Sequence, residues 1–113
     1  MQARLSYVIK FVGDMSEAVR FHRDRLGLPL KFQSPEWSEF ATGETTLALH
    51  AASVQNPAGT VQLGYAVDEL SRLYADRAAA GIEFTSAPQP LHGALLARFR
   101  DSEGADCSIS GKS

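Results

Sequence analysis

The chain has 113 residues, of which 44% are hydrophobic and 21% are charged, and its formal net charge is −2. This length and composition predict a single globular domain over residues 1–113 with a modest hydrophobic core. Lys and Arg are scattered among Asp and Glu and form no basic stripe, so we do not expect nucleic acid as a partner. Cys107 is the only cysteine, so no intrachain disulfide can form.

The first residues, MQARLSYVIKFVG, lack the long apolar core and small-residue cleavage site of a signal peptide. No apolar run approaches the roughly 18 residues that are needed to span a membrane. We therefore expect a cytoplasmic protein with no membrane partner.

The first half of the chain predicts a strand, a helix and three more strands. Residues 5–12 (LSYVIKFV) are rich in β-branched and aromatic residues, which is typical of a strand. We expect Asp14 or Ser16 to cap the helix that follows, and Gly27 to end it. The segments LPLKF, EWSEFA and TTLALH then read as short strands separated by turns.

The second half repeats this order after a linker at residues 55–60 (QNPAGT). VQLGYAV predicts a strand, Asp68 or Glu69 opens a helix, and Gly81 ends that helix. IEFTS, LLARFR and DCSIS are the remaining strands. The repeat predicts an α+β fold of two tandem β-α-β-β-β modules, residues 1–55 and 60–113. A ferredoxin-like order of elements is the alternative.

Two segments carry a resemblance to a known family. FVGDMSEAVRFHRDRLGLPL is similar to the first strand–helix segment of the vicinal oxygen chelate superfamily, and RFRDSEGADCSIS is similar to its final hairpin. This superfamily includes glyoxalase I, extradiol dioxygenases, fosfomycin-resistance enzymes and drug-binding bleomycin-resistance proteins. The resemblance implies curved mixed sheets that form cups, helices on their outer faces, and a homodimer.

In the metal-dependent relatives, the first and last strands of each module supply the metal ligands. The resemblance carries these positions onto Tyr7, His50, Gln62 and Ser108. Neutral Tyr and Ser are poor ligands, and a catalytic divalent ion needs about three good ones from His, carboxylate or thiolate. Gln ligates metal in some glyoxalases, but we expect no metal and no other cofactor here.

Alternation along each strand extends these positions into a predicted ligand cavity. Its residues are Tyr7, Ile9, Phe11, Thr46, Ala48, His50, Gln62, Gly64 and Ser108. The opposite faces, which include Leu47, Leu49, Tyr65, Val67, Cys107 and Ile109, are expected to pack beneath the helices. The alternative is that the cavity positions pack against one another and leave no space for a ligand.

The remaining candidate residues have open roles. His22 is expected at the surface or at the rim of the cup, and Trp37 either lines the pocket or shields the edge of the sheet. His92 is a solvated loop residue or part of a lid. Cys107 is expected to be a core residue and not a nucleophile, because no neighbouring feature lowers its pKa.

The predicted function is metal-independent binding of an apolar or planar small molecule in the sheet cup. The alternative is an enzyme. It is either a glyoxalase-like lyase or isomerase that uses His50 as general base, or a weak metal enzyme in which water molecules complete the coordination of the metal. The sequence leaves the identity of the ligand open.

Overall fold

The computed structural model describes residues 1–113 and divides into two compact units. The first unit is Ser6–Gln62, and the second is Leu63–Ser113 together with Met1–Leu5. The sequence placed the division in the linker at 55–60. The N-terminal residues group with the second unit, where Arg4 Nη1 lies 3.3 Å from Asp68 Oδ1.

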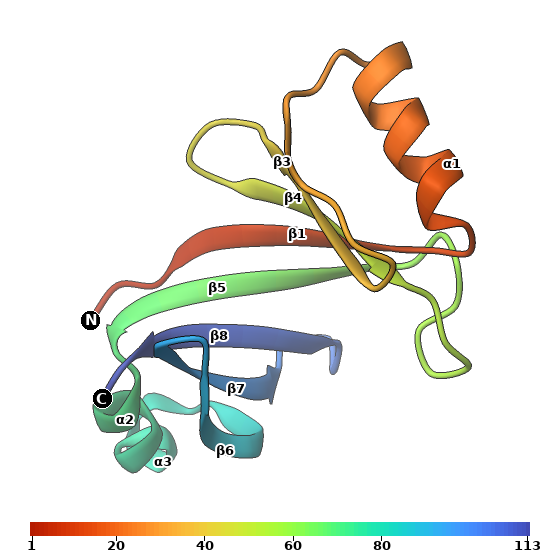
Figure 1. Ribbon diagram of the computed structural model, residues 1–113. Helices are drawn as coiled ribbons and strands as arrows, with labels where there is room; N and C mark the ends of the chain where they lie inside the picture. The colour runs from red at the N-terminus through yellow and green to blue at the C-terminus, as the bar shows by residue number, and fades with distance from the viewer. The chain divides into compact units, whose positions relative to one another are not determined.

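The first unit has the order strand, helix and three strands. It contains β1 (Arg4–Val12, which begins in the second unit), α1 (Met15–Arg20), a π-helical segment η1 (Phe21–Arg25), β2 (Leu30–Phe32), β3 (Trp37–Ala41) and β4 (Thr46–Ala51). Its sheet has the order β2-β3-β4-β1, with β4 parallel to β1 and the other pairs antiparallel (Figure 1).

The second unit repeats this arrangement. It contains β5 (Val61–Glu69, which begins in the first unit), α2 (Leu70–Ala75), α3 (Arg77–Ala80), β6 (Glu83–Leu91), β7 (Ala94–Arg100) and β8 (Asp106–Lys112). Its sheet has the order β5-β8-β7-β6, with β8 parallel to β5 and the other pairs antiparallel. The predicted α+β fold with two β-α-β-β-β repeats is therefore confirmed.

Each unit builds its core between its helix and one face of its sheet. In the first unit, Val19 of α1 packs with Phe40 and Leu49, and Val12 and Leu47 surround them. The corresponding cluster of the second unit consists of Val67, Leu70, Leu73, Ala97 and Ile109. These side chains come from alternate strand positions, as the sequence predicted. The other side of each sheet is called its helix-free face below.

Both predicted helices are less regular than the sequence suggested. Asp14 caps α1, because its Oδ1 accepts a hydrogen bond from the Glu17 N–H at 3.1 Å. The turn that follows is π-helical, with the Leu26 N–H donating to the Phe21 carbonyl at 3.2 Å. The second predicted helix is interrupted at Asp76. Gly81 ends it as expected, with a φ of 73° that only glycine adopts without strain.

The strand predicted at IEFTS is longer than expected, because β6 continues through Pro88 and Pro90. Prolines are tolerated in a strand at the edge of a sheet, and β6 is the outer strand of its unit. No helix of the chain has the length and apolar character of a membrane span.

Candidate functional site

The helix-free face of the first unit gathers all the predicted cavity positions of β1 and β4. In the parallel pair of these strands, Tyr7 lies opposite Thr46, Ile9 opposite Ala48, and Phe11 opposite His50. Residues directly opposite each other share a face. Val12 and Leu49, which pack on the helix, belong to the alternate set. Ile9, Phe11 and Ala48 form a buried cluster with Tyr7 and Trp37 beside it.

Four rings form a continuous row on this face. The centroids of Tyr7 and Trp37 are 5.9 Å apart, those of Trp37 and His50 5.8 Å, and those of His50 and Phe11 5.2 Å. Trp37 pairs with His50 between β3 and β4, so it lies with the predicted pocket residues. Tyr7, Trp37 and His50 are only partly buried. The row thus offers apolar ring surface with polar atoms at its margins.

His50 is held in one tautomer by its neighbour. Its Nδ1 lies 2.7 Å from the Ala51 carbonyl oxygen. A carbonyl only accepts hydrogen bonds, so Nδ1 carries the proton. In the neutral ring, Nε2 is then an acceptor, and the side chain can accept a hydrogen bond or a proton.

Glu39 is a member of this face that the sequence reasoning missed. It pairs with Ala48 between β3 and β4. Its Oε2 accepts a hydrogen bond of 2.8 Å from the indole N–H of Trp37, and its Oε1 lies 3.7 Å from Lys31 Nζ. Its side chain is 20% exposed. The two-residue spacing between Trp37 and Glu39 within one strand was the signal that could have found it.

Tyr7 is affected by the same carboxylate. Burial raises the pKa of its phenol, and the negative charge of Glu39 and a hydrogen bond to it add to that rise. The phenol therefore stays neutral at physiological pH, donates its one hydrogen to Glu39, and has oxygen lone pairs that can accept a hydrogen bond.

The helix-free face of the second unit has a different character. Gly64 lies opposite Ser108, and Ala66 lies opposite Ser110. On the other side of β8, Ser108 pairs with Arg98 of β7. The alternate residues, such as Ile109, pack on the helices. This face thus has small residues on β5 and β8, with Leu96, Arg98 and Arg100 beside them on β7. The sequence reasoning had not singled out Arg98.

Gln62, the remaining predicted residue, is at the start of β5, two positions before Gly64. It is 8% exposed, so its amide lies within the protein and not on its surface. In the first unit, to which it belongs, the structure gives Gln62 no hydrogen bond with His50 or Tyr7.

The donor groups of these faces are a poor set for a divalent ion. In the first unit the good donors are the His50 imidazole and the Glu39 carboxylate, and Glu39 is already engaged by Trp37 and Lys31. A neutral phenol at Tyr7 is a weak ligand. Neither unit brings together three His, Cys, Asp or Glu side chains that could hold a metal. Within either unit taken alone, a divalent ion therefore finds fewer than three good ligands.

Three other candidates lie away from these faces. His22 is on the helical side, where its ring stacks near Phe40 at 5.7 Å and its Nδ1 donates to the Ala18 carbonyl at 2.7 Å. Cys107 is buried, and burial raises the pKa of its thiol, with the charges of Asp101 and Asp106 adding to the effect. A thiol with a raised pKa is a weak nucleophile, in accord with a core role.

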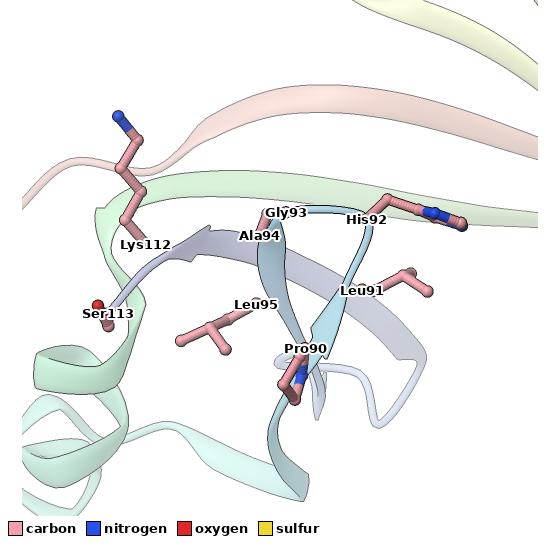
Figure 2. Close-up of a pocket in the computed structure, with 8 residues that line it drawn as sticks. All are labelled: Pro90, Leu91, His92, Gly93, Ala94, Leu95, Lys112 and Ser113. Carbon is pink, nitrogen blue, oxygen red and sulfur yellow. The ribbon is translucent and has the colours of Figure 1, made fainter.

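His92 is exposed at the tip of the β6–β7 hairpin and has a φ of 48°. It borders an open depression of about 550 Å³ that the hairpin forms with the C-terminal residues Lys112 and Ser113. Figure 2 shows the side chains of His92 and Lys112 extending in different directions and not toward a common point. The depression therefore lacks convergent polar groups.

Several solved structures share this fold. Methylmalonyl-CoA epimerase from Mycobacterium tuberculosis has a TM-score of 0.75 and 17% identity, covering 96% of this chain and 87% of that one. A glyoxalase/bleomycin resistance protein/dioxygenase superfamily member from Vibrio splendidus has a TM-score of 0.68 and 18% identity, covering 99% of this chain and 100% of that one. For a Streptomyces coelicolor methylmalonyl-CoA epimerase variant in complex with 2-nitronate-propionyl-CoA, the TM-score is 0.73 and the identity 13%, with coverage of 97% and 94%.

At these identities the likeness concerns the fold alone. No curated protein sequence matches this chain. Residues 4–107, however, match the sequence family described as the Glyoxalase/Bleomycin resistance protein/Dioxygenase superfamily. Because that match spans most of the chain and agrees with the repeated β-α-β-β-β order, the protein belongs to this superfamily.

Proposed function

We propose that the protein binds an apolar or planar small molecule on its helix-free sheet faces, and that it does so without a metal ion. The observation that carries the proposal is the row of Tyr7, Trp37, His50 and Phe11 on one face of the first unit. Ring surface of this kind stacks on planar guests, and a few polar atoms fix their orientation. The Nε2 atom of His50 and the phenol of Tyr7 supply those polar atoms.

For the first unit, the proposal keeps the seven positions expected from the sequence and adds two. The other two expected positions, Gly64 and Ser108, belong to the proposal for the second unit's face. Trp37 belongs to the aromatic row, and Glu39 holds its indole through the 2.8 Å hydrogen bond. The homodimer and the cytoplasmic location expected from the sequence are part of this proposal. Metal independence rests on the chemistry of the donors. On the first unit's face, the one imidazole nitrogen that could bind a metal is His50 Nε2, because Nδ1 donates to the Ala51 carbonyl.

A second candidate function is isomerisation by proton transfer, with His50 as the base. The tautomer fixed by the Ala51 carbonyl leaves Nε2 able to take a proton, which is what a general base requires. Structural neighbours that are named methylmalonyl-CoA epimerase have the same fold, so a fold of this kind does support an isomerase. Binding alone needs no such base.

The test begins with a thermal-shift screen of planar small molecules against the chelator-treated protein. A hit is then titrated by calorimetry against wild type, His50→Ala and His22→Ala. Loss of one hydrogen bond to a neutral ligand group costs about 0.5–1.5 kcal/mol, so we expect His50→Ala to weaken binding roughly 2- to 12-fold. His22→Ala is the matched control, because His22 lies on the helical side of the sheet. This variant should bind the hit with the affinity of wild type.

Equal losses in both variants, or no loss in His50→Ala, would contradict the proposed site. Binding that returns only when a divalent metal is added would contradict metal independence. For the second candidate, the same hit is incubated with the protein in D₂O. Proton transfer would be established if wild type incorporates deuterium at a carbon atom of the hit and His50→Ala does not. If wild type incorporates no deuterium, binding remains the function.

A further inference from the structure

Arg98 differs from every other arginine of the chain in its surroundings. Arg4, Arg20, Arg23 and Arg100 each pair with a carboxylate, and the guanidinium of Arg77 lies 4.1 Å from the ring centroid of Tyr74. Arg25 and Arg72 are exposed to solvent. Arg98 alone is half-buried, and its guanidinium has neither an ion pair nor a hydrogen bond.

The strand register places Arg98 beside the small residues of the second unit's helix-free face. Arg98 lies opposite Ser108, which in turn lies opposite Gly64, so the three residues form one row across β7, β8 and β5. The Cβ atoms of directly opposed residues are about 5 Å apart, which brings the Ser108 hydroxyl within the reach of the guanidinium and of a shared guest. Gly64 and Ser108 are buried and Arg98 is partly buried, so the row is shielded from bulk water.

The acidic residues around Arg98 do not neutralise it. Asp106 is on β8, diagonal to Arg98, and lies opposite Arg100. Arg100 Nε is 3.3 Å from Glu83 Oε2. No carboxylate of the unit is within ion-pair distance of Arg98. A half-buried cation without a partner has lost hydration without compensation, so an anion that reaches it is strongly favoured.

We propose that Arg98 and Ser108 form an anion-binding site, which takes the carboxylate or phosphate group of a ligand whose remainder lies over Gly64 and Ala66. A guanidinium binds either group through two parallel hydrogen bonds, and the serine hydroxyl donates a third. The inference rests on the proposed function, because Gly64 and Ser108 are on one of the helix-free faces proposed to bind a planar molecule. For the second unit's face it adds that this molecule is an acid.

The experiment compares three probes of the same shape: 2-naphthoate, 2-naphthyl phosphate and the neutral 2-naphthamide. Each is titrated by NMR against ¹⁵N-labelled wild type, Arg98→Met, Arg98→Lys and Arg25→Met. A charge-assisted pair of hydrogen bonds favours the anion by about 10-fold or more. We expect naphthoate or naphthyl phosphate to bind wild type tighter than naphthamide by that factor, with amide shifts at Gly64 and Ser108.

Arg98→Met should abolish the preference for the anion, and Arg98→Lys should keep part of it, because a lysine supplies charge without the planar fork. Arg25→Met, an exposed arginine without an ion-pair partner, should behave like wild type. Arg98→Lys also answers the question if Arg98→Met fails to fold. Whichever of the two anions binds wild type more tightly shows whether the site prefers a carboxylate or a phosphate.

Equal affinity of wild type for naphthamide and both anions would overturn the anion site and leave the proposed function standing. So would a preference for anions that survives in Arg98→Met and Arg98→Lys. Failure of all three probes to bind wild type would overturn both.

Discussion

The two units share one topology but differ in what their helix-free faces carry. Under the helices, both present the same kind of residue, with Val12 and Leu49 in the first unit and Val67 and Ile109 in the second. On the helix-free faces, the first unit has an aromatic row with one carboxylate. The second has glycine, alanine and serine on β5 and β8, with Arg98, which has no ion pair, beside them on β7. The covered face is thus constrained by packing, whereas the other face is free to acquire a site.

The largest expected effect comes from a position where the units differ by one methyl group. Ala51 lies opposite Val12, and Gly111 lies opposite Val67, so the two residues occupy equivalent places. A Cβ on Gly111 would lie 2.2 Å from the Val67 carbonyl oxygen and 2.9 Å from Leu70 Cβ. We expect Gly111→Ala to lower the free energy of unfolding by about 3 kcal/mol, as overpacking against rigid backbone does.

The matched control is Ala51→Gly, which removes the methyl group that the first unit tolerates. It should cost only about 0.5–1 kcal/mol, mainly through the greater freedom of the unfolded chain. Urea unfolding followed by circular dichroism measures both values. If Gly111→Ala is as mild as Ala51→Gly, the close approach of α2 to β8 is wrong.

The helix starts give the second contrast. Asp14 caps α1 through a hydrogen bond to Glu17, whereas Glu69 at the start of α2 makes no such bond with its side chain. We expect Asp14→Ala to destabilise the protein by about 1 kcal/mol, the usual cost of a lost cap. Glu69→Ala should stay within about 0.5 kcal/mol of wild type. Thermal unfolding of the two variants side by side tests this, and equal losses would show that the two helices begin alike.

The smallest effect concerns alkaline pH and is confined to the first unit. The pKa of Tyr7 is raised in the folded protein by burial and then by Glu39. Its contribution to stability is therefore complete below the unfolded tyrosine pKa of about 10 and is lost as the pH rises through the higher folded value. Tyr7→Phe should flatten the decline in unfolding free energy between about pH 9 and 11.

Ultraviolet titration of the phenol provides the direct measurement. In Glu39→Gln, one cause of the shift is removed, so Tyr7 should ionise at a lower pH than in wild type. An unchanged titration in Glu39→Gln would mean that the carboxylate does not act on the phenol.

The sequence predicted the faces better than the details of the helices. Period-two alternation assigned Leu49 and Ile109 to the helical side, because a one-residue slip would bury polar groups there. It could not predict η1, since a π-helical turn depends on how the helix meets the sheet and has no composition of its own. The sequence did contain a trace of it: Gly27 follows Met15 by one residue more than Gly81 follows Leu70, and a π-helical turn absorbs one extra residue.

Glu39 and Arg98 were missed for a different reason. Charged residues within short strands are common at exposed positions, so neither letter stands out. Their significance comes from the pairing of Glu39 with Ala48 and of Arg98 with Ser108, which is set by strand register and not by neighbours in the chain. The four ligand positions taken from the family resemblance did not include β3 or β7 at all.

The prolines of β6 have a consequence for how the protein behaves at high concentration. β6 is the long outer strand of its unit, and such an edge is where one chain can recruit another into an extended sheet. An incoming strand would find no N–H donor at Pro88 or at Pro90. The first unit blunts its edge differently, since β2 has only three residues and a lysine at its centre. The two edge strands thus resist fibrous aggregation in different ways. β6 lacks N–H donors at its prolines, and β2 is too short to pair with a long incoming strand.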